Sequence, residues 1–90
     1  MMMHKTNKEK ENKGKEIGKK LVEKGIATNY IKAFNMPTQQ NSIGIYIKRN
    51  YDIKKIGEQI RERYGFKTRI RYSIYDDEVD LLELKININD

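Results

Sequence analysis

The 90-residue sequence contains no cysteine and only one histidine, His4. Without cysteine the chain has no disulfide framework, no thiolate nucleophile and no cysteine-based zinc site. The single histidine and the two serines, Ser42 and Ser73, do not supply a Ser-His-Asp arrangement. The six glycines are too widely separated to build a phosphate-binding loop. We therefore expect a protein that is not an enzyme, with no catalytic residues, no metal site and no cofactor.

Long hydrophobic runs are also missing. No apolar stretch approaches the roughly 20 residues that a helix needs to cross a bilayer. Residues 1–6 lack the apolar stretch of a secretory signal. We therefore expect a cytoplasmic protein without a membrane partner.

Charge is abundant and unevenly distributed along the chain. Residues 26–75 carry a net charge of +7, whereas residues 76–90 carry −5. A basic body of this kind indicates a polyanionic partner or a charged protein surface. The lysine-rich residues 1–12 have nothing apolar to dock, so we expect a mobile basic N-terminal segment. A single domain is then predicted over residues 13–90, with no obvious internal repeat.

The first half of this domain is predicted to be helical. From about Lys13 a helix places Ile17 and Leu21 on one face, and Gly25 is well placed to end it as a left-handed cap. A second, shorter helix is expected after Thr28, with an apolar face made of Tyr30, Ile31 and Phe34. We do not favour a helix-turn-helix, because Leu21 stands where that motif has a small residue.

Residues 43–48 alternate isoleucine with other side chains, which is typical of a half-buried strand. Asp52 is then a suitable N-cap for a helix that Gly65 closes. Strands are predicted over residues 67–75 and 79–88, joined by a turn at residues 76–78. Pairing inward residues with each other sets Ile70 opposite Leu84 and Tyr72 opposite Leu82, with Arg71 opposite Glu83.

The fold class predicted is α+β: two N-terminal helices followed by a β-α-β-β unit, with a three-stranded sheet covered by helices on one face. The open edges of such a sheet make a homodimer possible. The predicted core consists of the inward members of the periodic segments: Ile43, Ile45, Ile47, Ile56, Ile60, Ile70, Leu82 and Leu84.

The outward face of the predicted sheet combines aromatic and cationic side chains. Bases stack on aromatic rings and cations meet phosphates, so this pattern favours binding of single-stranded nucleic acid. The predicted nucleic-acid-binding residues are Tyr46, Lys48, Arg69, Arg71, Tyr75 and Lys85.

Two alternatives use the acidic residues near the C-terminal end. A protein–protein interaction module, such as a phage or mobile-element inhibitor or adaptor, would present Asp76, Asp77, Glu78 and Glu83 to a basic partner. A metal-dependent nuclease would combine an acid at one strand end with Glu83 and Lys85 on the next strand. We favour this enzyme least, because Arg71 already supplies a charge partner for Glu83.

Overall fold

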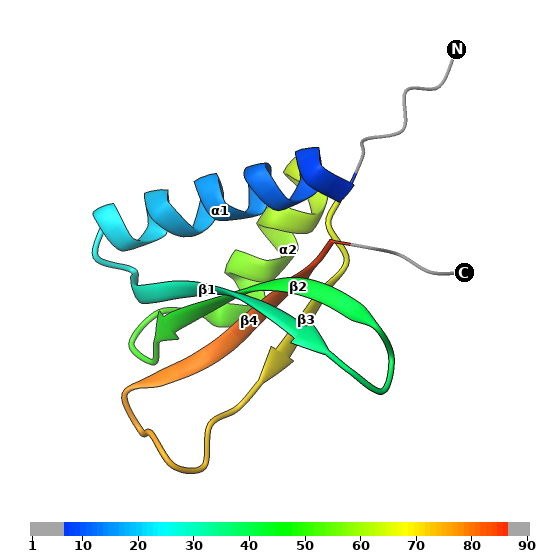
Figure 1. Ribbon diagram of the computed structural model, residues 1–90. Coiled ribbons are helices and arrows are strands. Elements are labelled where there is room, and N and C mark those ends of the chain that lie inside the picture. The colour runs from blue at the N-terminus through cyan, green and yellow to red at the C-terminus, as the bar shows by residue number, and fades with distance from the viewer. Residues whose placement is uncertain (1–6, 87–90) are drawn as a thin grey trace.

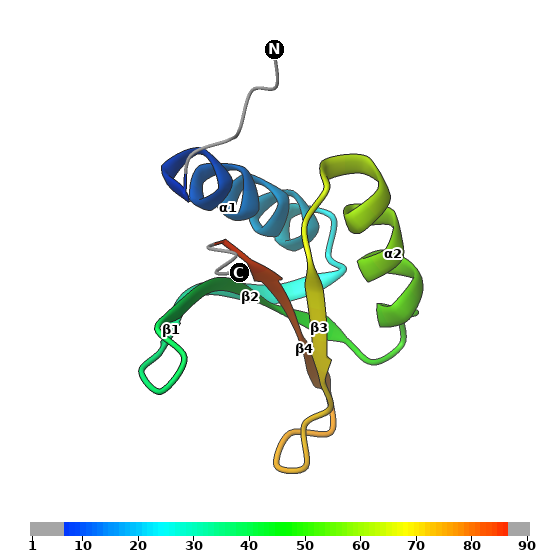
Figure 2. The same ribbon diagram turned by 90° about the vertical axis from the view of Figure 1, so that its right-hand side faces the viewer.

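Both helices of the protein pack on the same face of a four-stranded antiparallel sheet (Figure 1, Figure 2). The computed structural model describes residues 7–86. The sheet has the strand order β1-β2-β4-β3. The elements are α1 (Asn7–Glu23), β1 (Ala27–Asn35), β2 (Gln40–Lys48), α2 (Ile53–Tyr64), β3 (Thr68–Arg71) and β4 (Val79–Lys85). The α+β class is thus confirmed, whereas two N-terminal helices and a three-stranded sheet were wrong predictions.

Residues 27–35 form strand β1, not the predicted short helix. The pairing of β1 with β2 shifts register between Ala27 and Asn29, so that Ala27 pairs with Ile47 and Tyr30 with Ile45. Ala27 and Tyr30 therefore lie on the helix-covered face although they are three residues apart. The predicted helix face of Tyr30, Ile31 and Phe34 is divided by the strand: Tyr30 and Phe34 lie on the helix-covered side, and Ile31 lies on the other. Because this segment is a strand, the helix-turn-helix alternative is excluded as well.

Helix α1 begins at Asn7, so residues 7–12 belong to a helix rather than to the predicted N-terminal segment. The remainder of that segment, residues 1–6 with His4, lies outside the described residues. Ion pairs along the helix explain why a lysine-rich sequence is helical here: Glu11 pairs with Lys15 at 3.0 Å. Glu11 also pairs with Lys32 of β1 at 2.8 Å, which ties the first turns of α1 to the sheet.

Helix α2 has the predicted bounds. The Asp52 side chain accepts a hydrogen bond from the Lys55 N–H at 3.2 Å, and Gly65 ends the helix with a φ of 77°. Among residues 7–86 no helix has the length and apolarity needed to cross a bilayer.

The core lies between the sheet and the two helices. Six of the predicted core residues are buried there: Ile43, Ile45, Ile47, Ile60, Leu82 and Leu84. Ile56 and Ile70 are only partly buried and pack against this cluster. The core further includes Ile17, Ala27, Ile53, Phe66 and Ile86.

The β3–β4 register differs from the predicted one by two residues. Ile70 pairs with Leu82 rather than Leu84, and Thr68 pairs with Leu84. A shift of two keeps every side chain on its predicted face. Strand β3 ends at Arg71, so the side chains beyond it are exposed, Ile74 at 85% and Tyr75 at 94%.

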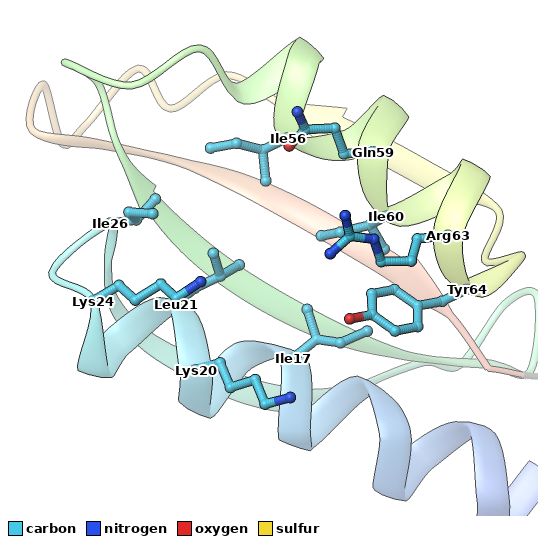
Figure 3. A pocket seen from close by; sticks show the side chains of 10 residues that line it. All are labelled: Ile17, Lys20, Leu21, Lys24, Ile26, Ile56, Gln59, Ile60, Arg63 and Tyr64. Carbon is cyan, nitrogen blue, oxygen red and sulfur yellow. The ribbon is translucent and has the colours of Figure 1, made fainter.

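The architecture consists of two αββ halves, α1-β1-β2 and α2-β3-β4, joined by the antiparallel pairing of β2 with β4. Each helix carries an Ile-Gly pair, Ile17-Gly18 in α1 and Ile56-Gly57 in α2. Each helix is also followed by a glycine with positive φ, Gly25 and Gly65. Figure 3 shows Ile17 and Leu21 of the first half facing Ile56 and Ile60 of the second. The repeat is therefore structural, although the sequence does not reveal it readily.

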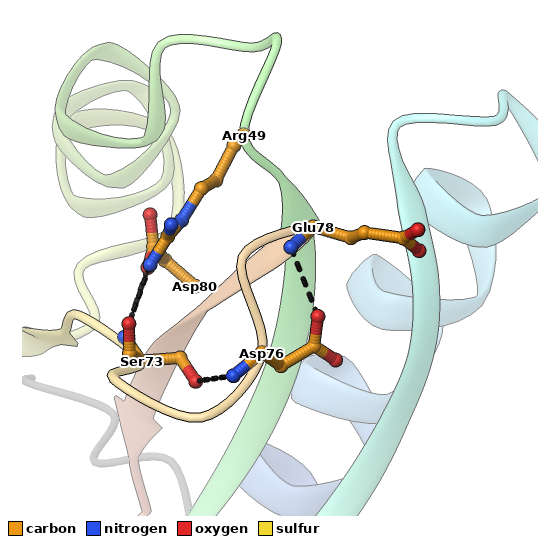
Figure 4. Close-up of polar contacts among 5 residues, drawn as sticks. All are labelled: Arg49, Ser73, Asp76, Glu78 and Asp80. Carbon is orange, nitrogen blue, oxygen red and sulfur yellow. Dashed lines mark hydrogen bonds and ion pairs between the residues drawn. The ribbon is translucent and has the colours of Figure 1, made fainter.

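A polar cluster around Asp80 ends the β3–β4 pairing (Figure 4). The Asp80 Oδ1 accepts hydrogen bonds from the Ser73 N–H at 2.9 Å and from Arg49 Nε at 3.2 Å and Nη2 at 3.1 Å. Arg49 Nη2 also donates to the Ser73 carbonyl oxygen. The loop beyond is closed by Asp76 N–H donating to Ser73 Oγ and by Glu78 N–H donating to Asp76 Oδ1, both at 2.9 Å.

Candidate functional site

Within residues 7–86, no helix or strand covers the sheet face opposite the helices, here called the open face (Figure 2). Strand alternation and register place most of the predicted binding residues on this open face. They are Tyr46 and Lys48 on β2, Arg69 and Arg71 on β3, and Lys85 on β4. The only carboxylate on the four strands that shares this face is Glu83 of β4.

Glu83 already forms an ion pair with one of these cations, Arg71. Arg71 Nε lies 3.0 Å from Glu83 Oε1, an ion pair that reaches diagonally because Glu83 pairs across the ladder with Arg69. Within residues 7–86 no ion pair involves Arg69 or Lys85. Together with Lys48, these two side chains are the cations of the open face that form no ion pair in the described part of the chain.

The open face is hollowed. One hollow of about 360 Å³ is lined by Ala33 and Asn35 of β1, Ser42 of β2 and Arg71 of β3. Because β1 and β3 are opposite edges of the sheet, a hollow that reaches both shows that the face curves inward. The β1–β2 turn and the β3–β4 loop both extend away from the helices on this side (Figure 1, Figure 2).

Arg69 and Lys85 line a smaller adjoining hollow of about 30 Å³. Arg71 and Glu83 line it too, together with polar side chains of the β1–β2 hairpin: Asn35, Gln40, Asn41 and Ser42. The structure thus brings Arg69, Arg71 and Lys85 together at one end of the sheet.

The other predicted residues are placed apart from this cluster. Lys48 lies at the opposite end of β2, where it shares a hollow with Asp77 and Glu78 of the β3–β4 loop. Tyr75 stands in that loop and not on a strand. Tyr46 is half-buried near the centre of the open face.

Apolar side chains at the centre of the open face were missed by the sequence interpretation. A Cβ added at Gly44 would lie 3.0 Å from Leu81 Cδ1 and 3.4 Å from Ile31 Cγ1, so these two side chains converge above the glycine. Phe34, 52% exposed, borders the larger hollow at the end of the β1–β2 hairpin, but strand alternation from Tyr30 places it on the helix-covered side of the sheet. It was assigned to the buried face of a helix, and only the strand assignment of residues 27–35 exposes it.

The alternative acidic set is divided by the fold. Asp76, Asp77 and Glu78 lie together in the exposed β3–β4 loop, whereas Glu83 lies on the open face against Arg71. Within residues 7–86 no group of three acidic or histidine side chains is arranged to hold a metal ion.

The charge of Asp80 is held by its hydrogen bonds. Burial raises the pKa of Asp80, but the donors Arg49 and the Ser73 N–H lower it by more, which leaves the pKa below its usual value. Asp80 is therefore ionised at neutral pH and fixes the base of the β3–β4 loop beside the open face.

Comparison of the chain with protein-family models, with curated proteins and with solved structures finds no significant match. Function has to be inferred from the surface chemistry of the chain itself.

Proposed function

We propose that the protein binds nucleic acid, preferably single-stranded, through the open face of the sheet. The observation that carries this proposal is the pair of cations Arg69 and Lys85, which form no ion pair within residues 7–86, at the concave end of the open face. Phosphates meet these cations, because backbone neutralisation by lysine and arginine dominates nucleic-acid affinity.

The apolar centre of the same face provides the surface for bases. Tyr46 and the converging Ile31 and Leu81 side chains offer apolar contact next to the cations. Unpaired bases can be splayed onto such a surface, whereas paired bases keep their faces stacked inside the duplex. This difference is the reason that a single strand is the favoured ligand.

The experiment measures binding of fluorescently labelled oligo-dT, oligo-rU and a mixed duplex over a range of salt concentrations. Arg69→Ala is expected to weaken binding and to flatten the slope of log affinity against log salt by about 0.7 for each single-strand phosphate that the variant no longer neutralises. The matched control is Arg61→Ala, because Arg61 is equally exposed but lies on α2, on the covered side of the sheet. Equal effects of the two variants would contradict the proposal.

A second pair of variants separates stacking from charge. Tyr46→Ala is expected to weaken single-strand binding by about 1–3 kcal/mol with an unchanged salt slope, since stacking releases no counterions. Ile74→Ala, which removes an exposed apolar side chain from the β3–β4 loop, serves as the control. A changed slope for Tyr46→Ala would mean that the ring acts through the cations instead.

A second candidate function rests on the β3–β4 loop. Its acidic residues Asp76, Asp77 and Glu78 are exposed, and hydrogen bonds within the loop hold them in place (Figure 4). We propose this loop as the partner-binding element of a protein inhibitor or adaptor if the wild-type protein shows no nucleic-acid affinity at physiological salt. In that case charge reversal at Asp76, Asp77 and Glu78 should abolish partner binding, while Arg69→Ala should not.

A further inference from the structure

An apolar groove of about 190 Å³ separates α1 from α2 on the helical side of the molecule (Figure 3). Its floor consists of the apolar side chains Ile17, Leu21, Ile26, Ile56 and Ile60. At one end the Lys13 Nζ lies 4.9 Å from the centre of the Tyr64 ring, which connects the two helices there. The groove lies on the opposite side of the sheet from the face proposed to bind nucleic acid.

The groove has a basic rim. Lys20, Lys24 and Arg63 line it together with Gln59, and no carboxylate is among the lining residues. Lys20 is paired with Glu16 at 3.3 Å. Lys24 and Arg63 take part in no ion pair within residues 7–86, and Figure 3 shows the Arg63 guanidinium turned toward the space between the helices.

The structural repeat explains why the groove is apolar. Ile17 and Ile56 precede the matching glycines of the two helices, and Leu21 and Ile60 follow one turn later. The groove therefore has two facing apolar rows with the spacing of helical turns. A third helix laid between two such rows can place one apolar side chain, and a second one turn away at i+3 or i+4, against both.

We propose that this groove binds an acidic amphipathic helix of a protein partner. Its apolar side chains would lie between the two rows, and its carboxylates would meet Lys24 and Arg63. The volume is below the roughly 300–1,000 Å³ of small-molecule pockets, and it suits one or two side chains of a partner. Charge complementarity selects the acidic sign.

A second copy of this chain does not satisfy that requirement. Helix α1 carries six lysines and four glutamates, and α2 carries four cations and two glutamates. Both helices are thus net positive, so docking either one over the basic rim would bring like charges together.

The test uses a synthetic helical peptide of about four turns, with leucines on one face and glutamates elsewhere, and fluorescence anisotropy as the measurement. We expect saturable binding to the full chain, and at least a tenfold loss for Arg63→Glu and for Lys24→Glu. The matched controls are Lys54→Glu on α2 and Lys19→Glu on α1, because both lysines are exposed and neither lines the groove. All four variants replace exposed side chains, and urea unfolding verifies that they stay folded.

Three results would overturn the proposal. The first is binding of the peptide no tighter than about 1 mM, or equal binding of a peptide with the same composition but no apolar face. The second is equal loss of affinity in the Arg63→Glu and Lys54→Glu proteins. The third is displacement of the peptide by monomeric decanoate, which would make a lipid-like anion the occupant. Methyl NMR shifts confined to Leu21, Ile56 and Ile60 on peptide addition would support the groove directly.

Discussion

Arg49 and Asp80 lie 31 residues apart in the sequence, yet two hydrogen bonds from one guanidinium join them, at 3.2 Å from Nε and 3.1 Å from Nη2. Arg49 follows β2, and Asp80 lies at the start of β4. The pair therefore holds the connection between the two halves of the protein against the β3–β4 loop. Asp80 is also one of the few buried polar residues, at 7% exposure.

The first prediction concerns this pair. Asp80→Asn removes the carboxylate that Arg49 and the Ser73 N–H share, and we expect the free energy of unfolding to fall by about 1–3 kcal/mol. Urea unfolding provides the measurement. Asp77→Asn, in the exposed part of the same loop, should change the free energy of unfolding by no more than about 0.5 kcal/mol. Equal effects would show that the loop is held by other contacts.

The second prediction concerns pH and Glu11. Hydrogen bonds from Lys32 and from Lys15 lower the pKa of Glu11 from 4.5 to about 2. A carboxyl whose pKa is lowered by folding stabilises the native state above pH 4.5, and this contribution is lost as the pH falls toward 2. In unfolding titrations between about pH 6 and pH 2, Glu11→Gln should therefore show a shallower loss of stability than wild type.

The control for this titration is Glu58→Gln, because Glu58 is exposed on α2 and forms no ion pair within residues 7–86. Its pH profile should follow that of the wild-type protein. A Glu11→Gln profile parallel to wild type would mean that the contacts to Lys15 and Lys32 do not favour the charged form.

The third prediction compares the matching glycines of the two helices. A Cβ at Gly18 would lie 2.8 Å from Tyr30 Cβ and Cγ, so the strand or the helix must move. A Cβ at Gly57 would lie 3.3 Å from Leu82 Cδ1, the end of a side chain. We expect Gly18→Ala to lower the free energy of unfolding by about 1–3 kcal/mol. The cost of overpacking is larger than the gain in helix propensity, up to about 1 kcal/mol, that alanine brings. Gly57→Ala should destabilise less in the same unfolding assay.

The fourth prediction concerns the core. Ile60, on the buried face of α2, is 5% exposed. Its truncation to alanine should lower the free energy of unfolding by about 2–5 kcal/mol. Ile74, 85% exposed in the β3–β4 loop, provides the same chemical change without burial, and Ile74→Ala should have little effect. Thermal and urea unfolding of both variants measure the difference. A reduction below about 0.5 kcal/mol for Ile60→Ala would contradict the packing of α2.

Sequence reasoning succeeded where local signals agreed with tertiary packing. Strand β2 alternates strictly, and α2 has a capping aspartate and a terminal glycine, so both were predicted with the correct type. Strand β1 was predicted wrongly because the i, i+1, i+4 spacing of Tyr30, Ile31 and Phe34 resembles a helix face, whereas the strand divides these residues between its two sides. The predicted end of β3 was also wrong. The strand ends where Asp80 bonds to Ser73 and to Arg49, and Arg49 is distant in sequence.

The candidate site could be predicted only in part. Alternation along β3 and β4 was enough to place Arg69, Arg71 and Lys85 on one face, since side chains alternate across a strand. The exclusion of Tyr75 and Lys48 from that cluster depends on where β3 ends and on how the β3–β4 loop returns. The curvature that brings β1 and β3 to one hollow is a property of the whole sheet.

The division into two αββ halves also determines how the chain can fold. Within each half the hairpin joins neighbouring strands, β1 with β2 and β3 with β4, so those contacts close short loops. Among the strand pairings, β2 with β4 joins the most distant residues, such as Ser42 with Lys85. We therefore expect that either half can nucleate first and that joining the two central strands across α2 is the slow step. Doubling the length of the closed loop at that step would add only about 0.6 kcal/mol of entropic cost.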